Sequence, residues 1–84
     1  MDKDWFIYMV ECSDKTLYTG ITTDLDRRIE EHNTDSRGAK YTRSRRPVHM
    51  VYFEEAISRS EASKREYQIK QLTRKDKLNL IRHF

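Results

Sequence analysis

The feature that most constrains the fold is an apolar run near the start of the chain, from Trp5 to Cys12 (WFIYMVEC). The run is rich in aromatic and β-branched residues and too short for a stable helix, so it predicts a strand. A turn cluster, Ser13 to Thr16, follows it, and Leu17 to Thr22 (LYTGIT) predicts a returning strand. The chain is therefore expected to begin with an antiparallel hairpin. Gly20 in the second strand indicates either a bulge or the close approach of another group to the backbone.

The rest of the chain predicts one further strand and three helices. Val48 to Phe53 is the expected third strand, with Pro47 at its start, where a missing N–H does little harm. The helices are expected to run from a cap at Thr23 or Asp24 to about Asn33, from Ser58 to Leu72, and from a cap at Thr73 to about His83, with Leu25, Ile29, Leu78 and Ile81 buried. The order ββαβαα predicts an α+β fold, in which a small three-stranded, largely antiparallel sheet is flanked by helices.

Length and charge bound the class of protein. The 84 residues are expected to form a single small domain, residues 1–84. Hydrophobic residues make up 36% and charged residues 37%, but the periodic segments and the scarcity of Pro and Gly favour a folded chain over a disordered one. The net charge is +3, and the segment from Arg37 to Arg46 holds five cations and no acid. Uneven basic charge suits a polyanionic partner, while a merely solvated face is the alternative.

The single cysteine and the hydropathy pattern bear on the compartment. Cys12 cannot form an internal disulfide and is expected to be a small buried hydrophobe. The chain has no apolar run near the roughly 20 residues of a membrane span, and its first residues do not resemble a signal peptide. A cytoplasmic setting is therefore expected.

Glu66 is a carboxylate in a position where a helix is expected to be apolar. Ser58 followed by Glu61 is the capping-box pattern that opens this helix. At about 100° per residue, Glu66 falls in the same stripe as Ala62 and Ile69. Burying an ionised carboxylate costs several kcal/mol unless a cation or a metal meets it. Either such a partner exists, or Glu66 is a solvated residue at the edge of the stripe.

Four other residues carry groups useful in chemistry. Arg28 and His32 are four apart on the first helix and border its buried stripe, while Tyr8 and Tyr18 lie in the two hairpin strands. Together with Glu66 they supply what phosphodiester hydrolysis requires: a ligand for a hard cation, a guanidinium for phosphate charge, and groups that move protons. Each taken alone has a plainer explanation, namely a surface Arg, a half-buried His, or tyrosines that pack in a sheet.

The order and spacing of these residues resemble the GIY-YIG nuclease family. Phe6-Ile7-Tyr8 stands where the family has Gly-Ile-Tyr, and Tyr18-Thr19-Gly20 stands where it has Tyr-Ile-Gly. Arg28 to His32 (RIEEH) is similar to the helical Arg…His element of the family, and Arg65 to Lys70 (REYQIK) to its metal-binding Glu element. The likeness is closest to the small stand-alone bacterial branch, UPF0213, whose members have stretches similar to residues 38–42 and 45–47.

This resemblance implies metal-dependent hydrolysis of DNA. Tyr18 would be the general base for the attacking water, with Tyr8 beside it in the active site. Arg28 would hold the scissile phosphate and its transition-state charge, and His32 would assist proton transfer or hydrogen-bond the phosphate. Glu66 would bind a single Mg²⁺ (or Mn²⁺). The departures from the family pattern, Phe6, Thr19 and Ile21 (where some members have a lysine), remove none of these side chains.

The leading hypothesis is thus a DNA endonuclease, structure-selective or engaged in repair, with RNA as an alternative substrate. A nucleic-acid-binding module with the same fold and little turnover is the second hypothesis. A protein adaptor is the third, and it predicts an exposed apolar patch that the polar composition does not favour. In each nucleic-acid hypothesis a flexible basic loop would contact backbone phosphates with little base readout, through Arg37, Lys40, Arg43, Arg45 and Arg46.

The two-tyrosine site carries a geometric requirement. Tyr8 and Tyr18 share one face of the sheet only if paired residues of the hairpin have numbers with an even sum, because side chains alternate with period two. A turn of residues 13–16 alone would pair Cys12 with Leu17, an odd sum of 29. The site therefore predicts an odd-length loop or a bulge, with Gly20 the expected place for the bulge.

Overall fold

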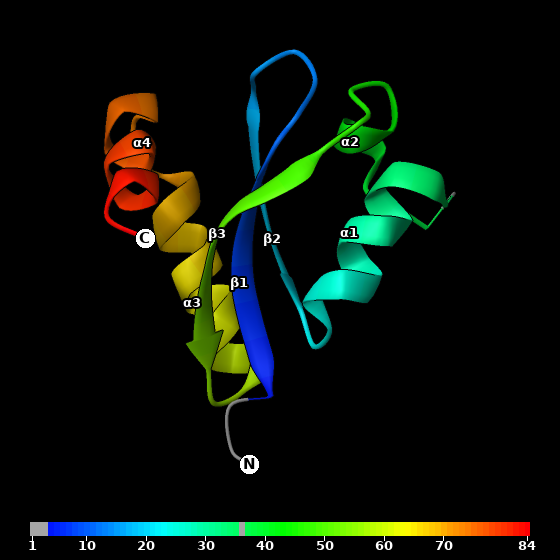
Figure 1. The fold of residues 1–84 in the computed structure, drawn as a ribbon. Coiled ribbons are helices and arrows are strands. Elements are labelled where there is room, and N and C mark those ends of the chain that lie inside the picture. The colour runs from blue at the N-terminus through cyan, green and yellow to red at the C-terminus, as the bar shows by residue number, and fades with distance from the viewer. Residues whose placement is uncertain (1–3, 36) are drawn as a thin grey trace.

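The protein is a three-stranded antiparallel sheet with helices on both faces (Figure 1). The computed structural model describes residues 4–35 and 37–84. The elements, in chain order, are β1 (Trp5–Glu11), β2 (Leu17–Thr22), α1 (Leu25–Thr34), α2 (Lys40–Arg43), β3 (His49–Ala56), α3 (Arg59–Lys70) and α4 (Arg74–Arg82). The strand order is β2-β1-β3, so β1 is central and β2 is an edge strand. The expected α+β class and sheet are confirmed, and α2 is an addition.

The register of the hairpin places both tyrosines on one face. β1 pairs with β2 so that Tyr8 lies opposite Gly20 and Val10 lies opposite Tyr18, each pair with an even sum of 28. The even sum comes from an odd-length loop, residues 12–16, in which Lys15 has a φ of 71°. The prediction of an odd-length loop is confirmed, and the bulge suggested at Gly20 is wrong.

The irregularity lies on the other side of the central strand. β1 and β3 change register between Met9 and Val10, which pair with Tyr52 and Met50, so Val51 is the extra residue on β3. β3 is also longer than expected, because it stays paired with β1 as far as Ala56. This bulge bends β3 across the sheet and leaves the β1–β2 register undisturbed.

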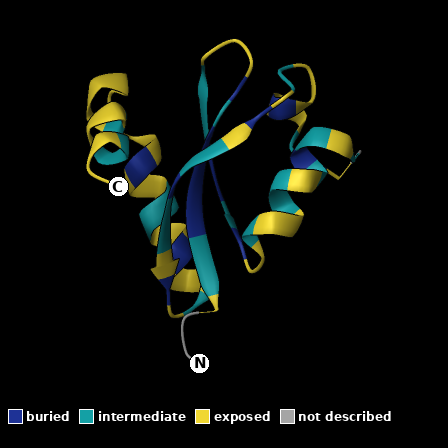
Figure 2. Cartoon of the chain, viewed as in Figure 1, coloured by how far each residue is buried: buried dark blue, intermediate teal, exposed yellow. Residues whose placement is uncertain are grey.

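The central strand is buried on both faces, which explains its nearly continuous apolar sequence (Figure 2). On one face, Ile7 and Met9 pack with Ala62 and Ile69 of α3, and all four side chains are at most 1% exposed. On the opposite face lie Tyr8, Val10, Cys12 and Val48, covered in part by Leu25 and Ile29 of α1. The expected burial of Cys12 is confirmed. Leu25 and Ile29 of α1 pack against this cluster as expected, but they are only half-buried.

Each long helix begins at the cap residue that the sequence indicates. A side-chain oxygen accepts a hydrogen bond from the backbone N–H three residues later, over 3.1 Å at Asp24, 3.1 Å at Ser58 and 3.2 Å at Thr73. Such caps satisfy N–H groups that would otherwise lack partners at a helix start. Their agreement with the sequence explains why the helix starts could be predicted.

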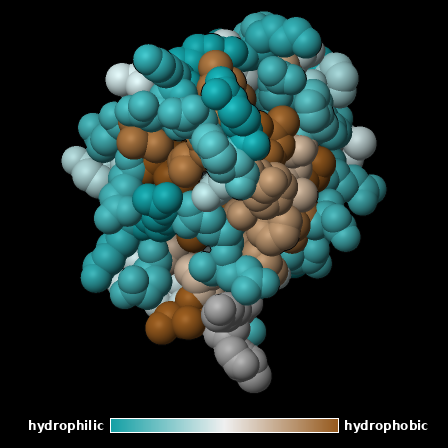
Figure 3. Space-filling model, turned by 60° about the vertical axis from the view of Figure 1, so that its left-hand side comes forward, coloured by the Kyte–Doolittle hydropathy of each residue, from teal (hydrophilic) through white to brown (hydrophobic). Residues whose placement is uncertain are grey.

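The last helix packs differently from expectation. Leu78 is 39% exposed, so its predicted burial is wrong, whereas Ile81 packs against the core as predicted, with Leu80 beside it. The ring of Phe84 follows the helix and contacts Tyr52 and Phe53 of β3. Figure 3 shows hydrophobic side chains gathered in the middle of this side of the molecule, bordered by hydrophilic ones. Within the described residues, no helix is both long and apolar enough to cross a membrane.

Candidate nuclease site

Four elements bring the five candidate residues together around the edge strand β2. The rings of Tyr8 (β1) and Tyr18 (β2) both lie against His32 of α1, with centroid distances of 5.8 Å and 5.5 Å. Arg28 of α1 and Glu66 of α3 are near enough for their charges to act on the Tyr8 hydroxyl. Residues far apart in the sequence therefore converge on one place in the fold.

The innermost part of the site is a buried polar network. The Tyr8 hydroxyl and His32 Nε2 lie 2.7 Å apart, and His32 Nδ1 lies 2.9 Å from Thr42 Oγ1. The Thr42 hydroxyl donates its own proton to the Ala39 carbonyl over 2.9 Å. The backbone N–H of Ala39 also donates to His32 Nδ1, over 3.3 Å. Both ring nitrogens of His32 therefore have protein partners.

Burial holds both members of this network in their neutral forms. It raises the pKa of Tyr8 to about 12, although the Arg28 guanidinium nearby acts in the opposite direction. Burial, and then the charge of Arg28, lower the pKa of His32 to about 4. His32 is 0% exposed, with both ring nitrogens occupied by protein groups. A hydrogen bond from His32 to a phosphate would break this network, so the geometry favours a positioning role for His32.

Two glycines make the close packing around this network possible. A Cβ added at Gly20 would lie 2.6 Å from the Tyr8 hydroxyl oxygen, so the absence of a side chain lets the phenol lie across β2. The close approach predicted as one explanation of Gly20 is thus confirmed. A Cβ at Gly38 would lie 2.6 Å from the Glu31 carbonyl oxygen and 2.9 Å from the His32 Cα. Gly38 therefore lets the loop after α1 lie directly on that helix.

Arg28 is held at the rim of the site rather than inside it. Its side chain is 24% exposed, and its Nη1 donates to Glu31 Oε1 and to the Arg37 carbonyl, each over 2.9 Å. Burial alone would lower the pKa of Arg28, but hydrogen bonds to Glu31 and Tyr8 raise it. The guanidinium is thus a fixed positive charge at an accessible place, which suits binding of a phosphate.

Glu66 lies at the border of the buried stripe of α3, as expected. Ala62 and Ile69 of the same helix are fully buried, whereas the Glu66 side chain is 23% exposed. The partner that meets its charge is Lys70, whose Nζ lies 3.1 Å from Glu66 Oε2. A partly exposed pair of this kind is weak and easily exchanged.

Tyr18 is supported on the side away from His32 by a stack that sequence reasoning missed. The Tyr41 ring stacks on Tyr18 with centroids 5.7 Å apart and an angle of 20°, and the Arg45 guanidinium lies 3.9 Å from the centre of the Tyr41 ring. Arg45 Nε in turn donates to Asp14 Oδ2 over 3.0 Å. The stack fixes the orientation of the Tyr18 ring. Nothing local in the sequence marks Tyr41 for this role.

The segment after α1 is structured, so the expectation of a flexible loop is wrong. Residues 40–43 form α2, and Arg46 donates from Nε to the His32 carbonyl over 2.5 Å and from Nη2 to the Asp35 carbonyl over 2.6 Å. Asn33 fixes the far end of the segment through two hydrogen bonds to the Val48 backbone. Arg46 therefore ties this segment to the end of α1, and Arg45 stabilises the stack of Tyr41 on Tyr18. The remaining three cations are exposed: Arg37, Lys40 and Arg43.

Comparison with known proteins bears on this arrangement. A family model described as the GIY-YIG catalytic domain matches residues 4–79. The chain belongs to the GIY-YIG family. A UPF0213 protein of Desulfotalea psychrophila is 62% identical over 78 residues, covering 93% of this chain and 71% of that protein. A UPF0213 protein of Staphylococcus aureus is 56% identical over 77 residues, covering 92% of this chain and 93% of that protein. The expected membership of the UPF0213 branch is thereby confirmed.

Two solved structures resemble this GIY-YIG domain as well. The solution NMR structure of a protein from E. faecalis has a TM-score of 0.65 and 43% identity, covering 100% of this chain and 91% of that one. The solution NMR structure of a UPF0213 protein from Bacillus halodurans has a TM-score of 0.58 and 44% identity, covering 92% of this chain and 81% of that one. The fold is therefore shared with close relatives.

The donor set at the GIY-YIG site fits one hard divalent cation. Glu66 offers a partly exposed carboxylate whose present partner, Lys70, can be displaced. Among the described residues, three or more His, Cys, Asp or Glu side chains nowhere gather closely enough to hold a metal ion without other ligands. Mg²⁺ typically binds proteins through one or two carboxylates and keeps several waters, so it matches such a site better than a metal that requires a full protein cage.

Proposed function

We propose that this protein is an endonuclease that hydrolyses phosphodiester bonds in DNA with the help of a divalent metal ion. The observation that carries the proposal is the convergence of Tyr18, Arg28 and Glu66 at the edge strand, backed by the buried Tyr8–His32 pair. Membership of the GIY-YIG family supports the same reaction class. RNA is the alternative substrate.

The proposed roles follow from burial and from hydrogen bonding. Tyr18 takes the proton from the attacking water, since Tyr8 is buried, has a pKa of about 12 and is already hydrogen-bonded to His32. Arg28 binds the scissile phosphate and stabilises the charge that develops on its oxygens. His32 and Tyr8 are both uncharged and held in place by hydrogen bonds, and the His32 ring packs against Tyr18 and orients it. The water oxygen forms the new bond to phosphorus, the bond to the leaving oxygen breaks, and that oxygen takes a proton from solvent water.

Glu66 would hold the metal ion, and Mg²⁺ (or Mn²⁺) bound there would polarise the phosphate and stabilise the leaving oxygen. Glu66 must leave Lys70 for this to occur, and both side chains are accessible enough to do so. The exposed cations of the segment after α1, Arg37, Lys40 and Arg43, would contact neighbouring backbone phosphates.

A panel of labelled nucleic acids tests the proposal. Blunt duplex, nicked, flapped, branched and single-stranded DNA, together with an RNA strand, are incubated with Mg²⁺ or with EDTA. Cleavage is expected with Mg²⁺ and not with EDTA. Glu66→Gln should lower the rate by at least about 10²-fold, as expected when a group that stabilises the transition state is lost.

Glu61→Gln is the matched control. Glu61 lies on the same helix and pairs with Lys64 at 3.7 Å, much as Glu66 pairs with Lys70, but it is exposed and away from β2. The Glu61→Gln variant should cleave DNA at the rate of the parent protein. A Glu66→Gln protein that cuts as fast as the parent would refute the metal site. A parent that binds DNA and cuts none of the substrates would instead be a binding module with the nuclease fold.

A further inference from the structure

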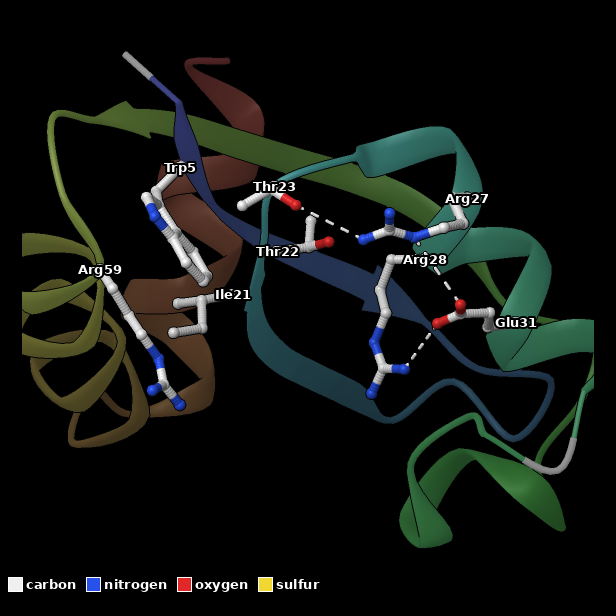
Figure 4. A pocket seen from close by; sticks show the side chains of 8 residues that line it. All are labelled: Trp5, Ile21, Thr22, Thr23, Arg27, Arg28, Glu31 and Arg59. Atoms are coloured by element: carbon white, nitrogen blue, oxygen red, sulfur yellow. Dashed lines mark hydrogen bonds and ion pairs between the residues drawn. The ribbon is translucent and has the colours of Figure 1, made fainter. Parts of the chain in front are cut away.

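A groove borders the candidate site and shares Arg28 with it. It has a volume of about 420 Å³ and lies between the start of α3 and the first half of α1 (Figure 4). Ile21 of β2 forms its floor, Trp5 and Arg59 lie on one side of Ile21, and Arg27 and Arg28 lie on the other. The volume is within the range of small-ligand sites.

The lining of this groove combines an aromatic ring with cationic side chains. Three guanidinium groups, those of Arg27, Arg28 and Arg59, face one carboxylate, that of Glu31. Glu31 is already paired with both arginines of α1, at 3.7 Å and 2.9 Å. The Arg59 guanidinium lies 5.9 Å from the centre of the Trp5 ring, at the outer limit of a cation–π contact. The groove is therefore positive on balance, with an indole at its border.

Such a combination is typical of sites that bind single-stranded nucleic acid. A positive groove follows the backbone, and an aromatic ring stacks on a base whatever its identity. A base inside an intact duplex has both faces covered by its neighbours, so stacking on a side chain is easiest for a base without stacked neighbours, as in a single strand, a flap or a frayed end. The ring at the border of the groove therefore discriminates by strand structure rather than by sequence.

We propose that this groove is a subsite for a nucleotide with an unpaired base, which stacks on Trp5 while Arg27 and Arg59 contact the flanking phosphates. The proposal rests on the proposed nuclease function in one respect: Arg28 belongs to both the groove and the candidate site, so the bound nucleotide is adjacent to the scissile phosphate. It assigns the substrate class as single strands, flaps or frayed ends.

The chain offers a direct probe of this subsite, because Trp5 is its single tryptophan. Indole fluorescence is followed while a short thymidine homopolymer, or a blunt two-stranded duplex of equal charge without a loop, is added in EDTA so that no cleavage occurs. Saturable quenching is expected with the single strand, and little with the duplex. Equal quenching by both, or none by either, would overturn the proposal.

Two variants separate stacking from folding. In anisotropy titrations with a labelled single strand, Trp5→Ala should weaken binding by about 5- to 150-fold, the range for loss of one stacked base, while Trp5→Phe should retain most of the affinity. Arg59→Ala, an exposed position that does not disturb the core, should weaken single-strand binding more than duplex binding. Lys64→Ala, on the same helix but outside the groove, is the matched control and should bind like the parent.

The outcomes distinguish this subsite from the nuclease proposal. A protein that shows the Trp5 response but cuts no substrate keeps the subsite and loses the nuclease function. A protein that cuts blunt duplex as fast as flapped DNA, with an unchanged rate in Arg59→Ala, keeps the nuclease function and loses the subsite. Preferential cleavage beside unpaired bases, lost in Arg59→Ala, supports both.

Discussion

The two faces of the sheet are built from the same strand by different means. The face toward α3 is mainly apolar: Ile7 and Met9 of β1 pack with Ala62 and Ile69 of α3. The face toward α1 buries Tyr8, His32 and Thr42, each hydrogen-bonded to the next. Both faces are closely packed, but the second buries a connected chain of polar side chains, in which each member has a partner.

This difference suggests that one face contributes mainly to stability and the other mainly to the geometry of the candidate site. Apolar packing contributes stability in proportion to the area buried and has no directional requirement. A hydrogen-bonded network contributes less net stability but fixes ring orientations, which a reaction requires. We therefore expect substitutions on the α3 face to change stability, and substitutions on the α1 face to change chemistry or its pH dependence.

The largest loss of stability is expected on the apolar face. Ile69→Ala removes a fully buried side chain and should lower the free energy of unfolding by about 2–5 kcal/mol, measured by urea titration. The cleavage rate of the protein that remains folded at low temperature should be unchanged. A large rate loss in fully folded Ile69→Ala protein would mean that the two faces are not separable.

The reverse pattern is expected for Arg28. Arg28→Ala should reduce the single-turnover cleavage rate at saturating protein by about 10²–10³-fold, since the guanidinium stabilises charge that develops in the transition state. Its effect on DNA affinity should be much smaller. Arg82→Ala, exposed at the end of α4, is the control for loss of one positive charge. A parent-like rate in Arg28→Ala would place Arg28 in the fold rather than in the chemistry.

His32 should make stability depend on pH. Its pKa is about 4 in the folded protein against 6.5 in an unfolded chain, so the unfolded state takes up a proton as the pH falls through this window and the folded state does not. The free energy of unfolding should therefore decrease with falling pH, by up to about 3 kcal/mol in all. Measurements in the upper half of this pH window report on His32 without the protonation of Asp and Glu side chains, which occurs at lower pH.

Two histidine variants sharpen that result. His32→Gln should be less stable than the parent at neutral pH and should show a flatter pH dependence. His83→Gln, which changes an exposed ring, should keep the dependence of the parent. Equal slopes in the parent and in His32→Gln would contradict a neutral buried His32.

Gly20 tests how tightly the polar face is packed. Gly20→Ala places a methyl group 2.6 Å from the Tyr8 hydroxyl oxygen and should cost about 1–3 kcal/mol of stability, measured by denaturant unfolding. Because Tyr8→Phe removes that oxygen, the double variant should lose less than the sum of the two single variants. Strict additivity would show that the two groups do not touch.

The smallest effect is expected for charges that lie outside both faces. Neutralising Arg37 and Lys40 together, as Gln, should weaken binding of duplex DNA and flatten the slope of log affinity against log salt by about 1.8, or about 0.9 for each lost phosphate contact. Lys64→Gln with Lys75→Gln removes the same charge elsewhere on the exposed surface. If both pairs flatten the slope equally, DNA binds to the basic surface in general, and the segment after α1 is not a preferred binding surface.

The parts that the sequence predicts are those determined by local rules. The helix starts at Asp24, Ser58 and Thr73 follow from side chains that reach N–H groups three residues away. The shared face of Tyr8 and Tyr18 follows from alternation along strands and the parity of one loop.

The missed parts depend on contacts between distant segments. Thr42 contacts His32 only because Gly38 allows the loop to lie on α1, and Tyr41 of α2 stacks on Tyr18 of β2. Lys70 lies one turn after Glu66, and its long side chain reaches back to pair with it. Leu78 fits the helical period, but the short α4 packs Leu80 against the core, beside Ile81, whose contact the sequence predicts. Periodicity does not determine which face a terminal helix presents.

The central position of β1 limits how the length of this chain can change. Inserting or deleting one residue between Ile7 and Val10 would move every following side chain of the strand to the opposite face, so the apolar core and the tyrosine pair would fail together. β3 has already accommodated such an extra residue, at Val51, without disturbing its neighbours. A change in chain length is therefore tolerated at β3 and in the surface turns. The length of β1 has to stay constant, because the strands and helices on both of its faces pack against its alternating side chains.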